Sequence, residues 1–161
     1  MDRLASNAVV LVAAGSETTA TLLAGVTYLL LSNPQAMATL KIEVRSAFNS
    51  PDEITIASAS RLPYMLACLN EALRMYPPVT GGLVRVIAEG GTTVAGHLIP
   101  GGTMVECGQW AMHHSSSHWQ DPWSFRPERF LDKDKGGMGK KDTFEALQAF
   151  SVGPRNCIGR K

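Results

Sequence analysis

The sequence predicts an α+β fold that is mainly α-helical with a small β region. Apolar residues repeat at helical spacing over the first half of the chain, and prolines interrupt the pattern. Short β-prone runs bounded by glycine and proline follow, at residues 83–88, 92–95 and 103–107. After Trp110 little regular structure is indicated. A chain of 161 residues is long enough for one domain with a substantial core.

Three helices are predicted before the strands. Residues 4–31 are apolar on nearly every face, which is typical of a long helix buried in a larger protein. Pro34 ends this helix, and Asn33 is expected to cap a second helix whose buried stripe is formed by Met37, Leu40, Val44 and Phe48. A third helix over residues 62–76 stops at two consecutive prolines.

Composition limits the function classes. A formal net charge of +1 gives no electrostatic reason to expect a nucleic-acid partner, so a small apolar ligand fits better. Three cysteines without a Cys-x-x-Cys pair argue against a disulfide framework and favour a reducing compartment. Residues 1–14 could pass for a signal peptide, but Asp2 lies where such a peptide is basic. Glu17 interrupts the apolar run, so we expect no transmembrane segment.

The ten residues that end at Gly159, Phe-Ser-Val-Gly-Pro-Arg-Asn-Cys-Ile-Gly, combine one cysteine with groups that suit a thiolate ligand of haem iron. Arg155 supplies a cation that can stabilise the Cys157 thiolate or pair with a haem propionate. Gly153 and Gly159 let the backbone turn around the cysteine so that amide N–H groups can face the sulfur. Phe150 adds an aromatic wall. The alternative is a surface loop with an unused thiol.

Glu71 and Arg74 are the only charges in the third predicted helix, and at three residues apart they are neighbours. They lie opposite the leucine stripe, where a solvated pair is the ordinary interpretation. The same face carries Ala67, Cys68 and Met75, which does not suggest a wetted surface. If the pair is buried, it needs further partners, because an uncompensated interior charge is costly.

A polar insertion, Ala-Gly-Ser-Glu-Thr-Thr at residues 14–19, interrupts the first apolar helix. Gly15 weakens the helix, and Thr18 can hydrogen-bond to the carbonyl four residues earlier and loosen the turn. Such a hydroxyl-lined turn can hold dioxygen. The alternative is a polar patch for helix packing.

Two further groups of residues are weaker candidates. A zinc site could be assembled from residues whose spacing matches no standard finger: Cys107, His113, His114 and His118. A lysine-containing loop could dock an acidic reductase, although such charge runs are most often solvated: Lys133, Lys135, Lys140 and Lys141.

With Phe-Arg-Pro-Glu-Arg-Phe at residues 125–130, these motifs resemble those of the cytochrome P450 haem-thiolate monooxygenases. The oxygen-helix motif, Glu-x-x-Arg, Pro-Glu-Arg-Phe and the cysteine loop occur in the family's order, across almost the whole chain. The pattern is most similar to microsomal, fungal-like members. The resemblance implies a partial cytochrome P450 fold with oxygen-binding helix, Glu-x-x-Arg helix, short β-sheet, meander and haem-binding loop.

The resemblance also implies roles for individual residues. Cys157 would be the axial thiolate of haem b, within a cofactor-binding loop that includes Phe150, Gly153, Arg155 and Gly159. Glu17 and Thr18 would be catalytic and relay protons to bound oxygen. A structural triad would comprise Glu71, Arg74 and Arg129.

Two more assignments follow from the family. Arg85 would bind a haem propionate, although an edge-strand charge that faces water is an equal alternative. The substrate cavity would be lined by Thr80, Gly81, Gly82 and Leu83.

The resemblance implies a monooxygenase that uses O2 and electrons from an NADPH-dependent flavoprotein reductase to hydroxylate a small apolar substrate. Such proteins lie on the cytosolic face of the endoplasmic reticulum, held by an N-terminal anchor that we do not find in this chain. Family members are longer. We therefore expect residues 1–161 to be a fragment of the domain, without its N-terminal part and the helix after the cysteine loop, and inactive alone. The rival interpretation is a haem-free truncated remnant with a structural or interaction role.

Overall fold

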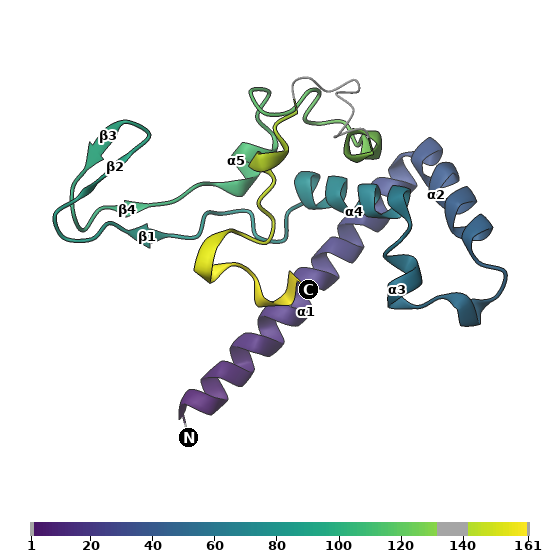
Figure 1. Ribbon diagram of the computed structural model, residues 1–161, viewed down its shortest axis with the longest axis horizontal. Coiled ribbons are helices and arrows are strands. Elements are labelled where there is room, and N and C mark those ends of the chain that lie inside the picture. Colours follow the sequence, from purple (N-terminus) through teal and green to yellow (C-terminus); the bar gives the residue numbers. More distant parts are fainter. Residues whose placement is uncertain (1, 132–141, 161) are drawn as a thin grey trace.

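A computed structural model describes residues 2–131 and 142–160 and confirms a mainly helical fold with a small β region (Figure 1). Helix α1 (Asp2–Ser32) is the longest element, and α2 (Pro34–Ala47) turns back from its C-terminal end. Helix α4 (Pro63–Met75) packs against both of them. The three helices predicted from apolar spacing and prolines are therefore present.

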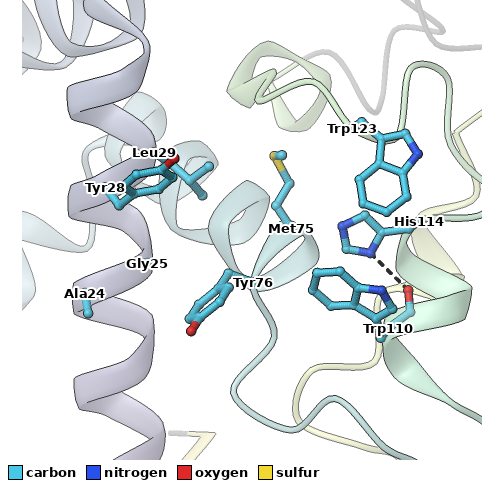
Figure 2. A pocket seen from close by; sticks show the side chains of 9 residues that line it. All are labelled: Ala24, Gly25, Tyr28, Leu29, Met75, Tyr76, Trp110, His114 and Trp123. Carbon is cyan, nitrogen blue, oxygen red and sulfur yellow. Dashed lines mark hydrogen bonds between the residues drawn. The ribbon is translucent and has the colours of Figure 1, made fainter.

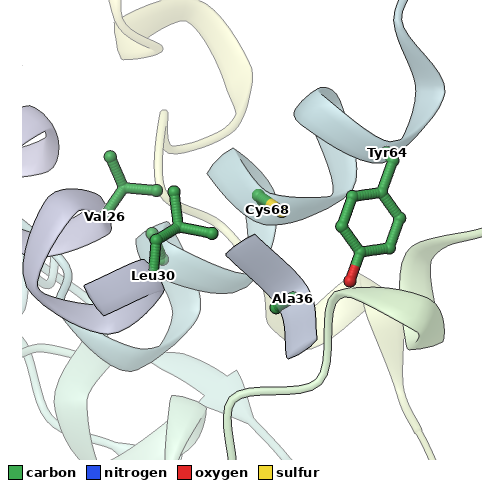
Figure 3. Close-up of a cluster of buried hydrophobic side chains, with 6 residues drawn as sticks. Val26, Leu30, Ala36, Tyr64 and Cys68 are labelled. Carbon is green, nitrogen blue, oxygen red and sulfur yellow. The ribbon is translucent and has the colours of Figure 1, made fainter. Parts of the chain in front are cut away.

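The core lies where the C-terminal half of α1 meets α2 and α4 (Figure 3). Small side chains from α2 and α4 let the three helices approach closely, and partly buried apolar residues pack around them. The predicted stripe of α2, from Met37 to Phe48, is half-buried. The core cluster consists of Val26, Leu30, Ala36, Tyr64, Cys68 and Ala72.

Asn33 does not cap α2 with its side chain, so that prediction was wrong. It occupies the position before the helix, but its side-chain amide donates to the carbonyl of Leu29 in α1 at 2.8 Å. The carbonyl is one of those left unpaired at the end of α1, and Asn33 is the single residue between the helices. The side chain therefore closes the preceding helix instead of opening the next one.

The start of α4 is capped from a distant position. Leu62, before the helix, has no capping side chain. The Glu43 carboxylate of α2 instead accepts hydrogen bonds from the backbone N–H groups of Tyr64 and Met65, both at 2.8 Å. A carboxylate at a helix N-terminus also interacts favourably with the helix dipole. Glu43 thereby fixes α2 against the first turn of α4.

The β region consists of two two-stranded antiparallel sheets. Strand β1 (Arg85–Val86) pairs with β4 (Met104–Val105), and β2 (Thr92–Val94) pairs with β3 (His97–Ile99). The sequence did not predict β3. The turn from β2 to β3 has positive φ at Ala95 (48°) and Gly96 (83°), which suits the twist of a tight hairpin.

Several short helices were also missed by the sequence analysis. Helix α3 (Ile56–Ala59) begins at a capping box formed by Thr55 and Ser58, and α5 (Gln109–His113) follows β4. Within residues 2–131 and 142–160 there are also five 3₁₀ helices, namely η1 (Pro51–Glu53), η2 (Pro127–Phe130), η3 (Phe144–Ala146), η4 (Gly153–Arg155) and η5 (Ile158–Arg160).

The N-terminal half of α1 is exposed in this chain, with Leu4 80% and Val12 71% accessible. By length and composition alone, Arg3–Ser32 is also apolar enough to cross a membrane, a test that buried core helices and signal sequences pass as well. The expectation that no segment spans a membrane therefore stays a prediction.

Candidate functional site

Glu71 lies at the centre of a buried ionic cluster. Its carboxylate accepts hydrogen bonds from Nε and Nη2 of Arg74, one turn further along α4, at 2.9 and 2.8 Å. Nε of Arg129, in η2, approaches the same carboxylate at 3.1 Å. The backbone N–H of Arg126 donates a fourth bond at 3.0 Å. The structure thus brings the three predicted triad residues together.

The two guanidinium groups have further acceptors. Arg74 donates from Nη1 to the carbonyls of His113 and Pro122, at 2.8 and 2.7 Å. Arg129 donates from Nη1 to Oδ2 of Asp142 at 2.6 Å. Sequence reasoning missed Asp142, because it ends a Gly/Lys/Asp stretch whose composition predicts a solvated loop.

Trp119 is fully buried beside the cluster. The Cζ atoms of Arg74 and Arg129 lie 5.4 and 5.9 Å from its ring centroid, within the range of a cation–π interaction. Such burial lowers the local dielectric constant, which strengthens each ion pair and raises the cost of breaking it.

His113 is also fully buried against this cluster. Its pKa is lowered to about 4, first because burial disfavours the charged ring, and second because Arg74 is a nearby cation. The backbone of Arg74 and Ala146 approaches the ring without forming a well-aligned hydrogen bond. His113 is therefore neutral at pH 7.

A cavity of about 450 Å³ lies between α1 and the C-terminal segment. Its volume is in the range of ligand and cofactor pockets. Thr18 of α1 lines it together with Cys157, although the two are far apart in sequence. Figure 1 shows the C-terminal segment, in yellow, beside the middle of α1. The other predicted residues in the wall are Leu83, Phe150, Arg155 and Gly159.

The backbone of the cysteine loop turns sharply before Cys157. Gly153 has φ of +79°, which a side chain would strain, and the N–H of Cys157 donates to the Phe150 carbonyl at 2.8 Å. A Cβ at Gly159 would lie 3.8 Å from the cysteine Sγ, at ordinary contact distance. The Cys157 thiol is free and exposed in the described structure.

Thr18 makes the back-bond that its position in α1 predicts, because its hydroxyl donates to the Ala14 carbonyl at 2.6 Å. The side chain is half-buried at the cavity wall. Glu17, the preceding residue of the helix, is exposed and does not line the cavity. The structure therefore separates the two predicted catalytic residues by their environment.

Arg85 is exposed, and its Nη1 donates to the carbonyl of Val84 at 3.0 Å. Of the four predicted substrate-contacting residues, Leu83 alone lines the cavity. Gly82 faces another segment, since a Cβ there would lie only 2.7 Å from the Glu106 Cβ. The backbone carbonyl of Thr80 accepts a hydrogen bond from the N–H of Trp110 at 3.0 Å, and Gly81 is exposed.

A second cavity, of about 420 Å³, lies on the other side of the α4 C-terminus (Figure 2). The His114 ring stacks between Trp110 and Trp123, with centroid distances of 4.0 and 4.4 Å. Across from this stack, Figure 2 shows Tyr28 and Leu29 on α1. Burial lowers the pKa of His114. None of the residues assigned to haem or substrate lines this cavity.

Within the described part of the chain, no three His, Cys, Asp or Glu residues are grouped to hold a metal ion. Cys107 is exposed, and its Sγ lies 3.7 Å from Sδ of Met112. The lysines considered for reductase docking lie outside the described residues: Lys133, Lys135, Lys140 and Lys141.

Comparisons with known proteins agree on one family. A family model described as Cytochrome P450 matches residues 1–161. The chain is 54% identical over 159 residues to cytochrome P450 monooxygenase tpeC of Talaromyces stipitatus, which covers 99% of the chain and 31% of that relative. It is 48% identical over 159 residues to the trichothecene C-15 hydroxylase of Fusarium sporotrichioides, which covers 98% of the chain and 32% of that relative. The chain thus spans about a third of the length of the curated relatives that it matches.

Proposed function

The chain belongs to the cytochrome P450 family, and on that premise we propose that it carries the haem-binding part of a monooxygenase that hydroxylates a small apolar organic substrate with O2. One observation carries the proposal. Thr18, from the motif that resembles the oxygen helix, lines the same cavity as Cys157 from the motif that resembles the haem loop. Two local patterns 139 positions apart thus meet at one cavity.

The residues of this cavity fit a haem group. The apolar side chains Leu22, Leu73 and Val79 suit the faces of a porphyrin, and Cys157 offers a soft sulfur ligand for iron. A buried side-chain oxygen of Gln109 at the wall has no hydrogen-bond partner among the described residues, so this acceptor is available to a hydrogen-bond donor that enters the cavity. When bound, thiolate-ligated haem supplies the O2 chemistry that inserts one oxygen atom into a C–H bond.

Arg155 is assigned to the cofactor as its cation, because it lines the cavity in the same loop as the cysteine. A guanidinium there can stabilise the thiolate form of Cys157 or pair with a propionate. Phe150 contributes its ring to the wall, and its carbonyl restrains the cysteine N–H. Gly153 and Gly159 are proposed to allow the backbone conformation of the loop around Cys157.

Thr18 and Glu17 are proposed to move protons to the site of oxygen chemistry. The Thr18 hydroxyl donates a hydrogen bond to the Ala14 carbonyl, so delivery of a proton requires this O–H to turn from Ala14 towards the cavity while its oxygen accepts a proton from the Glu17 side. Glu17 is accessible to solvent, which makes it suitable to exchange protons with water and unsuitable to contact substrate directly. In this proposal protons pass from solvent to Glu17, then to Thr18, and then into the cavity.

The ionic cluster of Glu71, Arg74 and Arg129 is assigned a structural role. Support comes from its burial and from the Glu71 carboxylate, which already accepts four hydrogen bonds and is therefore poorly suited to proton transfer. Arg85 is assigned to a haem propionate, which requires its side chain to leave the Val84 carbonyl that it now contacts.

The substrate and partners follow from family membership. Leu83 supports an apolar substrate, with Thr80, Gly81 and Gly82 assigned to the same segment. The electron donor is proposed to be an NADPH-dependent flavoprotein reductase. The location is proposed to be the cytosolic face of the endoplasmic reticulum.

The cysteine assignment is tested in a full-length context, on the haem-loaded protein with matched cysteine variants. Ferrous haem with carbon monoxide should give the red-shifted band of thiolate ligation in the wild type. Cys157→Ala should lose that band, whereas Cys107→Ala should keep it, because Cys107 is exposed and does not line the cavity. If Cys157→Ala kept the band, the ligand would be another residue. A wild-type protein that takes up no haem would instead support the haem-free remnant.

A further inference from the structure

We propose that Asp142 is a positioning residue that completes the ionic cluster and holds the segment leading to Cys157 in place. The inference rests on the proposed function, since it concerns the loop assigned to the haem ligand. It adds to that proposal a carboxylate outside the three residues of the Glu-Arg-Arg triad.

Charge balance requires a second carboxylate. Glu71, Arg74 and Arg129 together carry a net charge of +1, and all three are buried. Carbonyl dipoles solvate a guanidinium but do not neutralise it. Asp142 brings the cluster to zero, because its side chain is 2% exposed and its Oδ2 lies 2.6 Å from Nη1 of Arg129. An interior cation without this partner would be uncompensated.

Asp142 also joins two segments through the backbone of Gln120. Its Oδ1 accepts a hydrogen bond from the Gln120 N–H at 2.7 Å, and the Gln120 carbonyl accepts from both Nη1 and Nη2 of Arg129 at 3.2 Å. The carboxylate, the guanidinium and the peptide group thus form a closed ring. The next N–H, of Thr143, donates to the carbonyl of His118 at 2.7 Å.

The segment that follows Asp142 leads directly to the proposed haem loop. The Phe144 ring packs edge-on against Trp119 and Phe130, at centroid distances of 5.8 and 5.4 Å. Residues 149–151 then line the first cavity, and the Phe150 carbonyl accepts the N–H of Cys157 at 2.8 Å. If Asp142 lost its contacts, the start of the segment that leads to Cys157 would therefore no longer be held in place.

Asp121 provides a matched control. It forms an ion pair with Arg126 at 2.9 Å, so it too is an aspartate paired with an arginine, but its side chain is 61% exposed. Exposed pairs contribute little to stability. The two aspartates thus differ in burial and in their connection to the cysteine loop.

Both measurements are made in a full-length context, and the first needs no haem. We expect Asp142→Asn to lower the ratio of folded to unfolded haem-free protein at least tenfold in urea unfolding, because it leaves the buried cluster of Glu71, Arg74 and Arg129 with a net charge of +1. Asp121→Asn should change this ratio less than threefold. Asp142→Glu restores the charge and should recover most of the loss.

The second measurement separates positioning from general stability. In the haem-loaded protein, Asp142→Asn should lower the fraction of bound haem that gives the red-shifted carbon monoxide band by at least half. Glu43→Gln serves as a comparator, since it weakens the start of α4 without touching this segment. It should lose stability while the band fraction per bound haem stays at the wild-type value.

Each outcome decides the inference. It is overturned if Asp142→Asn behaves like Asp121→Asn in both measurements, or if Glu43→Gln lowers the band fraction as much at equal loss of stability. A wild-type protein without the thiolate band would refute the proposed function, while the haem-free unfolding measurement would still decide the charge argument. A thiolate band in the wild type with no effect of Asp142→Asn would refute this inference alone.

Discussion

Replacing Glu71 by alanine removes the shared anion of the buried cluster. Four hydrogen bonds end on its carboxylate, from Arg74 twice, from Arg129 and from the backbone of Arg126. Afterwards Arg129 still has Asp142, whereas Arg74 keeps carbonyl acceptors only. The main cost therefore falls on Arg74, a fully buried cation without a carboxylate.

The expected loss of folding free energy follows from that one uncompensated charge and not from a sum over the four hydrogen bonds. Removing one partner of a buried ion pair costs about 3–5 kcal/mol. At about 1.4 kcal/mol per factor of ten, the ratio of folded to unfolded protein falls by roughly two to three and a half orders of magnitude. For a domain of this length each kcal/mol shifts the melting temperature by about 2–4 °C, so Glu71→Ala should melt roughly 6–20 °C lower.

Urea and thermal unfolding of the haem-loaded protein measure this loss. Glu71→Gln keeps an acceptor oxygen without the charge and should fall between wild type and Glu71→Ala. Asp121→Ala removes an exposed ion pair and should cost less than about 1 kcal/mol. If Glu71→Ala melted within about 2 °C of the wild type, by the same scale less than about 1 kcal/mol, and kept its haem, the structural role of the cluster would be wrong.

Three other predictions follow. Thr18→Ala should keep haem and substrate binding but divert reducing equivalents to peroxide, measured as peroxide formed per NADPH oxidised; coupling at the wild-type level would contradict the proton role. Because the pKa of His113 is lowered to about 4, the unfolded state binds more protons below the ordinary value of 6.5, so stability should fall by about 2 kcal/mol from pH 7 to pH 5. His113→Asn should lose this slope, and an unchanged slope would assign it to other groups. Residues 1–161 expressed alone with haem should aggregate or remain largely without haem, because α1 exposes apolar side chains such as Leu4 and Val12; a soluble monomer with stoichiometric thiolate-ligated haem would overturn this.

Sequence patterns predicted those elements whose determinants are local. Apolar spacing and the prolines at the helix boundaries were enough for α1, α2 and α4. Helix α3 and strand β3 were missed because four and three residues are too few to produce a period. Asn33 was misassigned because a capping residue between two helices can serve either one, and only the three-dimensional path of the linker decides which.

The residues of the candidate site also differ in whether local sequence spacing could identify them. Glu71 and Arg74 are one helical turn apart, so their neighbourhood could be recognised from spacing. Asp142 could not, because its partner Arg129 is 13 residues away and the sequence between them has no periodic pattern. Glu43 escaped for a similar reason, since it caps a helix that begins 20 residues later. Long-range carboxylates therefore need the tertiary structure to identify them.

The two cavities share one stripe of α1. Thr18 lines the first and Gly25 the second, and seven residues separate them, which is almost two full turns and about 10 Å along the axis. Gly25 is also a point of close approach to the end of α4, since a Cβ there would lie 2.7 Å from Cδ1 of Tyr76. The absence of a side chain at Gly25 therefore allows α1 to pack closely against the end of α4. A side chain at that position would have to displace the Tyr76 ring or move α1, and a movement of α1 would also change the cavity at Thr18, almost two turns away.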